Sequence, residues 1–296
     1  MKIQVLMSVY NGEKYLVQQI DSVLGQKDVE LSLLIRDDGS KDDSIKMIET
    51  YMETHPNIHL LKGENIGVIA SFYELSLRAG DDFDFYAYCD QDDVWLEDKL
   101  SRAVSFLTKP EIPQLYCSKA QLVDEQLNFL QLSHSGIPRK ESAMIQNIVI
   151  GCTAVMNNKM HGLVVERVPD YSQIRMHDSW FYKLGIFFGE VYFDDESRIL
   201  YRQHESNAIG LSNTFFGRVM QSVNDGRKRL YLNELIEFQK LFGDKLSARD
   251  SYENKRYLSA KKSLAGRIRY LVSPYVKKQT FGKNIWFKIQ FLLNWT

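Results

Sequence analysis

The chain has 296 residues, of which 44% are hydrophobic and 25% charged, with only 17 Gly and 6 Pro. This length suits one large domain or two small ones, and the composition excludes collagen-like and low-complexity chains. The formal net charge is −1. Glu253 is the last acidic residue and ten Lys or Arg residues follow it, so the part up to Glu253 carries about −11. An acidic body with a basic tail indicates chemistry in one part and attachment in the other.

Short apolar runs alternate with helical patterns along the first hundred residues. Such alternation predicts a mostly parallel sheet with helices on both faces, and with ligands beyond the carboxyl ends of its strands. Strands are predicted over Ile3–Val9, Leu31–Ile35, Ile58–Leu61 and Phe83–Cys89. Helices are predicted over Glu13–Leu24, over a segment capped by Ser40 that includes Ile45 and Ile48, and over Val68–Arg78.

After Leu100 the pattern changes to shorter pieces. The predicted strands there are Gln114–Tyr116, Ile148–Val155, Val191–Phe193 and Ile199–Tyr201, and the predicted helices are Asn158–Val165 and Ser179–Leu184. Long helical periodicity begins near Phe215. We therefore expect an α/β domain over residues 1–214 and a helical, basic C-terminal extension over residues 215–296.

Three cysteines, Cys89, Cys117 and Cys152, are too few and too widely spaced for a zinc site or a disulfide framework, which fits a reducing compartment. The N-terminal residues lack the apolar region and cleavage site of a signal peptide. No uninterrupted run reaches the ~20 apolar residues of a membrane-spanning helix. These features predict a cytoplasmic protein.

Polar segments follow three of the predicted strands. Ser8–Gly12 follows the first, Asp37–Ser40 the second and Asp90–Asp93 the fourth, so all three should open onto one crevice. The glycine-rich loops that usually cradle phosphate are absent from the sequence. Carboxylates repel a diphosphate unless a divalent cation bridges the two, and Mg²⁺ or Mn²⁺ prefers oxygen ligands. Asp90-x-Asp92 supplies such a bridge.

These segments, SVYNG, DDGS and D-x-D-D, resemble those of the family 2 glycosyltransferases, which have the GT-A fold. The later motifs resemble the bacterial rhamnosyltransferase branch: Gly151-Cys152-Thr153, Met176–Trp180, and Tyr201–His204 with Asn207 and Gly210. The resemblance covers about residues 1–210. It implies a GT-A catalytic domain over 1–214, with a nucleotide-sugar-binding half at 1–100 and an acceptor half at 101–214.

The resemblance also implies roles for the donor side. Asp38, with Asp37 beside it, would face the uracil or thymine edge of the donor, whose imide N–H a carboxylate can accept. Asp90 and Asp92 would hold the diphosphate through Mn²⁺ or Mg²⁺, with His204 closing the metal site. The remaining candidates for the nucleotide sugar are Ser8, Tyr10, Asn11, Gln91 and Arg202. For Asp93 the best explanation is an acid at the N-terminus of a helix beginning near Trp95, and its role is left open.

Inverting transfer needs a base for the acceptor hydroxyl and a group that takes up charge on the departing diphosphate, which a metal does. The resemblance points to Asp178 as the base. The alternative is that Asp178 caps the helix it begins, and His177 before it is interpreted as structural. Gly151, Cys152, Thr153 and Trp180 are candidates on the acceptor side, with Cys152 a packed residue rather than a nucleophile.

We therefore expect a metal-dependent enzyme that transfers one sugar, L-rhamnose from dTDP-rhamnose, to a hydroxyl of a cell-surface glycan or lipid-linked oligosaccharide. A transferase for UDP-glucose or UDP-galactose is the alternative, followed by a non-catalytic protein that binds sugar nucleotides. A nucleotidyltransferase is disfavoured because Tyr10–Glu13 is not a glycine-rich basic loop. The Gln-x-x-Arg-Trp signature of processive synthases is absent, which predicts one sugar per visit.

The basic tail carries a helical apolar stripe ended by Pro274 and then an aromatic segment over residues 281–295 that Lys283 and Lys288 interrupt. This pattern predicts peripheral attachment to an anionic membrane at its inner face. The alternative is that the helices pack on the body or form a homodimer. Nucleic-acid binding is disfavoured because the acidic body would repel a phosphate backbone. The stripe comprises Leu264, Ile268, Leu271, Val272 and Tyr275, with Arg267 and Arg269 on its flanks.

Overall fold

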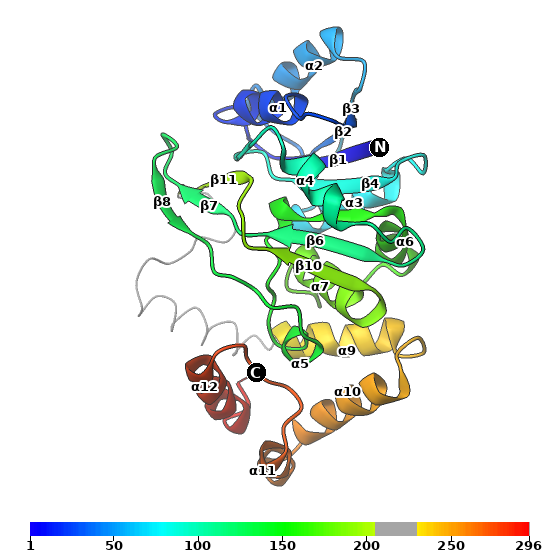
Figure 1. Cartoon of the computed structure of the whole chain (residues 1–296), viewed down its shortest axis with the longest axis vertical. Helices are drawn as coiled ribbons and strands as arrows, with labels where there is room; N and C mark the ends of the chain where they lie inside the picture. The colour runs from blue at the N-terminus through cyan, green and yellow to red at the C-terminus, as the bar shows by residue number, and fades with distance from the viewer. Residues whose placement is uncertain (205–229, 296) are drawn as a thin grey trace. The chain divides into compact units, whose positions relative to one another are not determined.

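The computed structural model describes residues 1–204 and 230–295, which divide into two compact units (Figure 1). Unit 1 takes in residues 1–136, 149–168 and 189–204. Unit 2 takes in residues 137–148, 169–188 and 230–295. The predicted boundary between residues 214 and 215, and the motif residues Asn207 and Gly210, lie outside the described residues.

Unit 1 is built on a seven-stranded sheet with the order β10-β6-β9-β4-β1-β2-β3 (Figure 1). Strand β9 pairs antiparallel with both of its neighbours, and the other pairs in the sheet are parallel. The predicted α/β fold with a mostly parallel sheet is therefore confirmed. The strands are β1 (Lys2–Val9), β2 (Glu30–Asp37), β3 (Ile58–Lys62), β4 (Phe85–Cys89), β6 (Gln114–Ser118), β9 (Val155–Asn157) and β10 (Glu190–Asp194).

The main core of unit 1 follows from the alternation of side chains along a strand. Ile3, Val5 and Met7 of β1 point to one face of the sheet, where they share a fully buried cluster with Leu16 and Ile20 of α1. Removing this apolar surface from water is the main force that holds helix and sheet together. The helices of this unit are α1 (Leu16–Leu24), α2 (Ser44–Thr54), α3 (Val68–Arg78), α4 (Lys99–Phe106) and α6 (Asn158–Glu166).

A second, four-stranded sheet in unit 1 has the order β5-β11-β7-β8. Of its strands only β11 was predicted, because the others have two to four residues and no clear period. The strand predicted over Ile148–Val155 is wrong: Gly151–Thr153 forms a 3₁₀ turn, in which the Thr153 hydroxyl donates to the Ile150 carbonyl at 2.8 Å. The strands are β5 (Val94–Trp95), β7 (Gln121–Val123), β8 (Phe129–Leu132) and β11 (Ile199–Arg202).

Unit 2 is helical in its described part. The Trp180 indole packs edge-on against Phe238 and Phe242, with ring centroids 5.6 and 6.3 Å apart. Farther along the chain, Tyr270 and Phe291 pack on each other at 5.3 Å. None of the described helices is both long and apolar enough to cross a membrane. The helices are α5 (Lys140–Ala143), α7 (His177–Phe188), α9 (Leu230–Phe242), α10 (Ala248–Ala260), α11 (Leu264–Val272) and α12 (Phe281–Leu292).

A fully buried ion pair joins α7 to α9 in unit 2. Lys183 Nζ lies 3.2 Å from Glu234 Oε2, both side chains are 0% exposed, and the Ser179 hydroxyl donates to the same oxygen at 3.1 Å. Lys183→Met should lower the free energy of unfolding by about 3–5 kcal/mol, because it leaves a buried carboxylate without its partner. Urea unfolding measures this loss. Lys255→Met, at an exposed position on α10, should change stability by less than about 0.5 kcal/mol. Equal effects of the two changes would show that the pair does not stabilise unit 2.

Candidate active site

Strands β4, β1 and β2 are neighbours and parallel, so the polar segments after them meet at one edge of the sheet. The Gln91 side chain accepts from the backbone N–H of Tyr10 at 2.7 Å and donates to its carbonyl at 3.1 Å. The Ser40 hydroxyl accepts from the backbone N–H of Asn11 at 2.9 Å. The predicted crevice-forming loops are therefore joined to one another. Ser40 does not cap a helix as predicted, because α2 begins at Ser44 and Ser40 is used to hold the first loop.

Asp37 ends β2 and organises the turn that follows. Its Oδ1 accepts from the backbone N–H groups of Gly39 and Ser40 at 3.0 and 2.9 Å. Gly39 has a φ of 84°, in the left-handed region that glycine adopts without a steric penalty. The Asp37 side chain is 0% exposed, so in this structure it serves the turn.

The Asp38 side chain is also buried, and it holds the segment before α3 against the end of β2. It forms an ion pair with Arg36, and its oxygens accept from the backbone N–H groups of Ile66 and Gly67 at 2.9 and 3.0 Å. These contacts tie the end of β2 to the segment before α3. Contact of Asp37 or Asp38 with a nucleobase stays a prediction.

The loop after β1 contributes exposed side chains at the carboxyl edge of the sheet. Tyr10 is 43% exposed and Asn11 is exposed beside it, whereas the Ser8 hydroxyl is hydrogen-bonded to the Ser71 hydroxyl at 2.6 Å. Tyr10 thus presents an aromatic ring to solvent next to the acidic loop. Such a ring is a suitable surface for a planar base.

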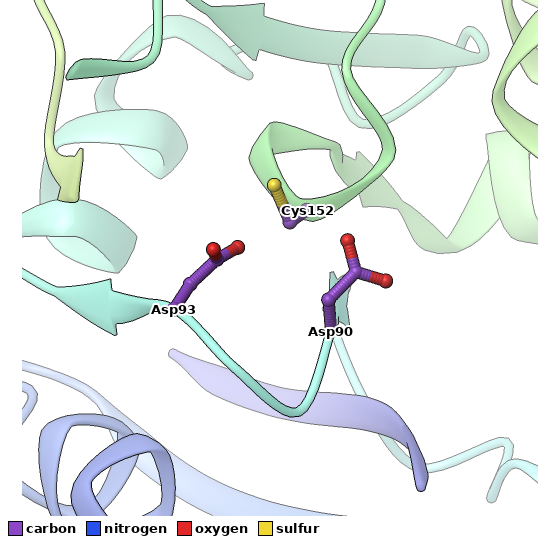
Figure 2. A group of neighbouring side chains, drawn as sticks. All are labelled: Asp90, Asp93 and Cys152. Atoms are coloured by element: carbon purple, nitrogen blue, oxygen red, sulfur yellow. The ribbon is translucent and has the colours of Figure 1, made fainter. Parts of the chain in front are cut away.

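Figure 2 shows the carboxylates of Asp90 and Asp93 on either side of the Cys152 side chain, and one ligand atom from each of the three residues lies within 4.8 Å of the others. Burial, followed by the charges of Asp92 and Asp90, raises the pKa of Asp93 well above its ordinary value. Asp93 does not begin a helix, which was its best explanation from sequence, because residues 94–95 form β5 and α4 begins only at Lys99. Three neighbouring carboxyl groups disfavour one another's ionisation, and a divalent cation would relieve this repulsion.

The donor set of this acidic cluster fits a hard divalent cation through its carboxylates. Asp90 and Asp93 offer the oxygen ligands that Mg²⁺ and Mn²⁺ prefer. Burial raises the pKa of the Cys152 thiol well above its ordinary value, so Cys152 stays a neutral thiol. Asp92 lies 2.9 Å from His204 Nε2. The three residues predicted to bind the metal therefore do not form one group in this structure. Asp90 lies beside Asp93, and Asp92 is paired with His204.

Lys99 is a residue of this region that the sequence did not single out. Its Nζ lies 3.4 Å from the centroid of the Trp95 ring, and its side chain is almost fully buried. Burial lowers its pKa to about 8, while the neighbouring thiols and Asp93 oppose this shift. A lysine at the first position of α4 gives no sign in the sequence that the charge of Asp93 acts on it.

Arg202 holds the acidic loop in place. Its backbone N–H donates to Asp93 Oδ1 at 3.0 Å, and its Nε donates to the Asp92 carbonyl at 2.9 Å. The guanidinium also donates to Gln18 and to the Glu125 carbonyl, and the residue is 2% exposed. In this structure Arg202 therefore positions the loop, and a diphosphate contact by the same group stays a prediction.

The predicted acceptor residues are packed inside their units. Cys152 and Thr153 are 1% and 0% exposed in unit 1, and Gly151 begins their 3₁₀ turn. Trp180 is 0% exposed in unit 2. The side chains of these residues serve packing in this structure, and acceptor contact by them stays a prediction.

Asp178 lies in the first turn of α7 in unit 2 and is 7% exposed. Its Oδ1 is buried and has no hydrogen-bond partner within the described residues. Burial raises its pKa to about 6, with the Glu234 charge adding to this shift and the Arg175 charge opposing it. Burial lowers the pKa of the neighbouring His177 to about 3, so this histidine is neutral. Asp178 therefore combines an unpartnered oxygen with a pKa suited to a general base.

The family model for glycosyl transferase family 2 matches residues 4–155, which include the three joined loops and the acidic cluster. The chain belongs to this family. The dTDP-rhamnosyl transferase RfbG of Shigella flexneri is 25% identical, over 97% of this chain and 99% of its own length. The chain is therefore a glycosyltransferase with a rhamnosyltransferase relative, as the motifs predicted.

Solved structures confirm the GT-A fold. Staphylococcus aureus TarS 1–349 in complex with UDP-GlcNAc matches with a TM-score of 0.57 and 15% identity, over 100% of this chain and 89% of that one. The mannosyltransferase PcManGT of Pyrobaculum calidifontis, in complex with GDP-Man and Mn²⁺, matches with a TM-score of 0.53 and 15% identity, over 99% and 85% of the two chains. At this identity the two structures show the fold alone.

Proposed function

We propose that this glycosyltransferase moves L-rhamnose, with inversion, from dTDP-rhamnose to a hydroxyl of a cell-surface glycan or lipid-linked oligosaccharide. The observation that carries the proposal is the acidic cluster at the carboxyl edge of the sheet, which suits a nucleoside diphosphate held through a divalent cation. The end-to-end similarity to RfbG supports rhamnose as the sugar. UDP-glucose or UDP-galactose remains the alternative donor.

The proposal assigns donor binding to unit 1. Tyr10 offers its exposed ring to the nucleobase, next to the turn that Asp37 and Asp38 hold. Asp90 and Asp92, with Asp93 beside them, would hold Mn²⁺ or Mg²⁺, which supplies charge neutralisation for the departing diphosphate. Arg202 and His204 keep the acidic loop in place for this task.

The proposal assigns acceptor activation to Asp178 in unit 2. Its carboxylate takes the proton of the acceptor hydroxyl as the acceptor oxygen forms a bond to the anomeric carbon of the sugar. The bond from that carbon to the diphosphate oxygen breaks, and the nucleoside diphosphate leaves. A base with a pKa near 6 is deprotonated at neutral pH and still able to accept a proton.

A panel of nucleotide sugars tests the proposal directly. Binding and hydrolysis of dTDP-rhamnose, UDP-glucose, UDP-galactose and GDP-mannose are measured with Mn²⁺, with Mg²⁺ and with EDTA. We expect dTDP-rhamnose to bind most tightly and to lose its binding in EDTA. A preference for a UDP-hexose would mean that the UDP-hexose, and not dTDP-rhamnose, is the donor. If none of the four nucleotide sugars binds with either metal, the proposal is overturned.

We also propose that the C-terminal helices attach the enzyme to the anionic cytoplasmic leaflet. On α11, Leu264, Ile268 and Val272 are 56%, 52% and 84% exposed and recur every four residues, on one face. On α12, the face opposite the packed Phe287 and Phe291 is also apolar. Its residues Phe281, Ile285, Ile289 and Leu292 are 84%, 46%, 44% and 37% exposed.

The two helices that carry these exposed stripes contact one another. The Arg267 guanidinium, beside the α11 stripe, donates to the Leu292 carbonyl at the end of the α12 stripe at 3.0 Å. Ten basic residues and no acidic ones follow Glu253, and each basic residue near an anionic surface contributes about 1 kcal/mol. An exposed apolar face bordered by cations is suited to the membrane interface.

Val272→Glu combined with Phe281→Glu should reduce binding to phosphatidylglycerol vesicles at least tenfold, because two charges replace the most exposed apolar side chains. Vesicle sedimentation measures this. Tyr252→Glu, at a 62% exposed position on α10, is the matched control and should bind like the wild type. If vesicle binding is unchanged and light scattering instead shows that the double variant lowers the molecular mass from dimer to monomer, the stripes form a homodimer contact.

A further inference from the structure

Cys152 adds a sulfur atom to the two carboxylates of the acidic cluster (Figure 2). One ligand atom from each of Asp90, Asp93 and Cys152 lies within 4.8 Å of the others. Mg²⁺ prefers oxygen ligands alone, whereas Zn²⁺ binds both carboxylate oxygen and thiolate sulfur. The ligand atoms of the cluster therefore suit a second class of cation besides the hard ions that the carboxylates favour.

Asp93 brings to the cluster a carboxylate oxygen without a strong hydrogen-bond donor. The residue is 1% exposed, and its Oδ1 accepts from the backbone N–H of Arg202 at 3.0 Å. No N–H or O–H group of the described residues donates to its Oδ2, which is buried. The Cys152 thiol, which is only a weak donor, interacts with the same carboxyl group. A buried carboxylate in this state is stabilised when a cation binds it.

The spacing of the three ligand atoms suits a single small cation. Zn–S bonds are about 2.3 Å long and Zn–O bonds about 2.0–2.2 Å, so two atoms bound to one Zn²⁺ lie at most about 4.5 Å apart. The ligand atoms of the cluster are within 4.8 Å of one another, which small rotations of the side chains bring to this limit. Asp90 is only partly buried, so the cluster is not sealed from solvent.

Lys99 balances the charge that a Cys152 thiolate would carry. Its side chain is almost fully buried, and its Nζ makes no hydrogen bond with the described residues. Its charge acts on both Cys152 and Asp93. Two carboxylates and a thiolate carry three negative charges, which Zn²⁺ and the Lys99 ammonium group together cancel. A neutral thiol would leave one positive charge over, so the buried lysine favours a thiolate once a divalent cation is bound.

We infer that Cys152, Asp90 and Asp93 form a site for thiolate-binding divalent cations, chiefly Zn²⁺, which compete with the Mn²⁺ or Mg²⁺ of the transfer reaction. On binding, the S–H bond of Cys152 breaks, its proton passes to water, and the electron pair left on sulfur forms the bond to the metal. No atom changes its oxidation state. This inference shares the acidic cluster with the proposed function and goes beyond it, since it requires no nucleotide sugar.

Zinc held in this way should support transfer poorly. Zn²⁺ with three protein ligands keeps one open position, whereas an octahedral cation bound by two carboxylates keeps several for a diphosphate. Zn²⁺ should therefore displace Mn²⁺ from the wild-type chain. Electron paramagnetic resonance measures this displacement as a rise in free Mn²⁺, with no turnover required.

Cadmium absorption and zinc calorimetry test the site on the full chain without nucleotide. Wild type should show the ultraviolet charge-transfer band of a thiolate bound to Cd²⁺. Cys117→Ser, which removes another buried thiol of unit 1, is the matched control and should keep the band and the wild-type affinity for Zn²⁺. Cys152→Ser should lose the band and bind Zn²⁺ about tenfold or more weakly, while its affinity for Mn²⁺ changes by less than about threefold.

The sulfur ligand can be disproved in three ways. A band that persists in Cys152→Ser would assign the thiolate to another cysteine. Absence of the band in the wild type, with Zn²⁺ still bound, would place the metal on other ligands such as Asp92 and His204. Equal losses of Zn²⁺ and Mn²⁺ affinity in Cys152→Ser would show that Cys152 only packs. Each of these results would overturn the inference.

The carboxylate ligands and the proposed function are tested separately. Asp93→Asn should weaken the binding of both Zn²⁺ and Mn²⁺, and an unchanged affinity for Zn²⁺ would overturn the inference. If no nucleotide sugar binds with either metal while Zn²⁺ binding still depends on Cys152, the proposed function fails and the zinc site stands. If a nucleotide sugar binds with Mn²⁺ and Zn²⁺ binding does not depend on Cys152, the zinc site fails and the proposed function stands.

Discussion

Asp178→Asn should lower turnover by ~10²-fold or more while the affinity for the nucleotide sugar stays unchanged. Asn has the shape of Asp and lacks its basicity, so the change removes proton transfer and little else. Rapid quench measures turnover, and calorimetry with Mn²⁺ measures donor affinity. Asp170→Asn, which removes an exposed carboxylate in the same unit, is the control and should keep near-wild-type turnover. Loss of donor binding with an unchanged rate would mean that Asp178 only caps α7.

The pH dependence gives an independent readout of the same base. Burial raises the pKa of Asp178 to about 6, so the carboxylate is deprotonated above that pH and protonated below it. Turnover of the wild type should therefore be level above about pH 6 and fall about tenfold per pH unit below it. The residual turnover of Asp178→Asn should not show this fall below pH 6. A wild-type profile that stays flat down to pH 4.5 would exclude Asp178 as the base.

The location of the acidic edge could be predicted from sequence because it depends on a simple geometric rule. Segments at the carboxyl ends of adjacent parallel strands must meet, and strand alternation is visible in the apolar pattern of residues 1–100. The ends of elements were less accurate. Helix α1 begins at Leu16 and not at Glu13, because the Glu13 backbone and carboxylate are used in hydrogen bonds to the loop at Asp42 and Asp43.

The partners that set the electrostatics of the site could not be predicted. The charge of Asp93 acts on Lys99, Arg36 pairs with Asp38, and Glu234 pairs with Lys183 of α7, 51 residues before it in the chain. Each of these residues belongs to an ordinary helix or strand by its own pattern, so only tertiary packing shows its role. The same reason explains why the sequence did not predict the grouping of the metal-binding candidates. The spacing of Asp90, Asp92 and Asp93 does not show that Asp90 and Asp93 lie together while Asp92 contacts His204.

Asp92→Ala should lower transfer by about 10³-fold or more at saturating Mn²⁺, because losing several kcal/mol of charge stabilisation at the leaving diphosphate has this effect. The fold should be intact, since the Asp92 side chain is 17% exposed and its hydrogen bond to His204 joins two loops and not the core. Steady-state kinetics and thermal melting measure the two quantities. Asp82→Ala, which removes an exposed carboxylate near the opposite end of β4, is the matched control and should retain full activity. Near-wild-type turnover of Asp92→Ala at saturating metal would show that Asp90 and Asp93 hold the cation without Asp92. The role of Asp92 would then be to position His204.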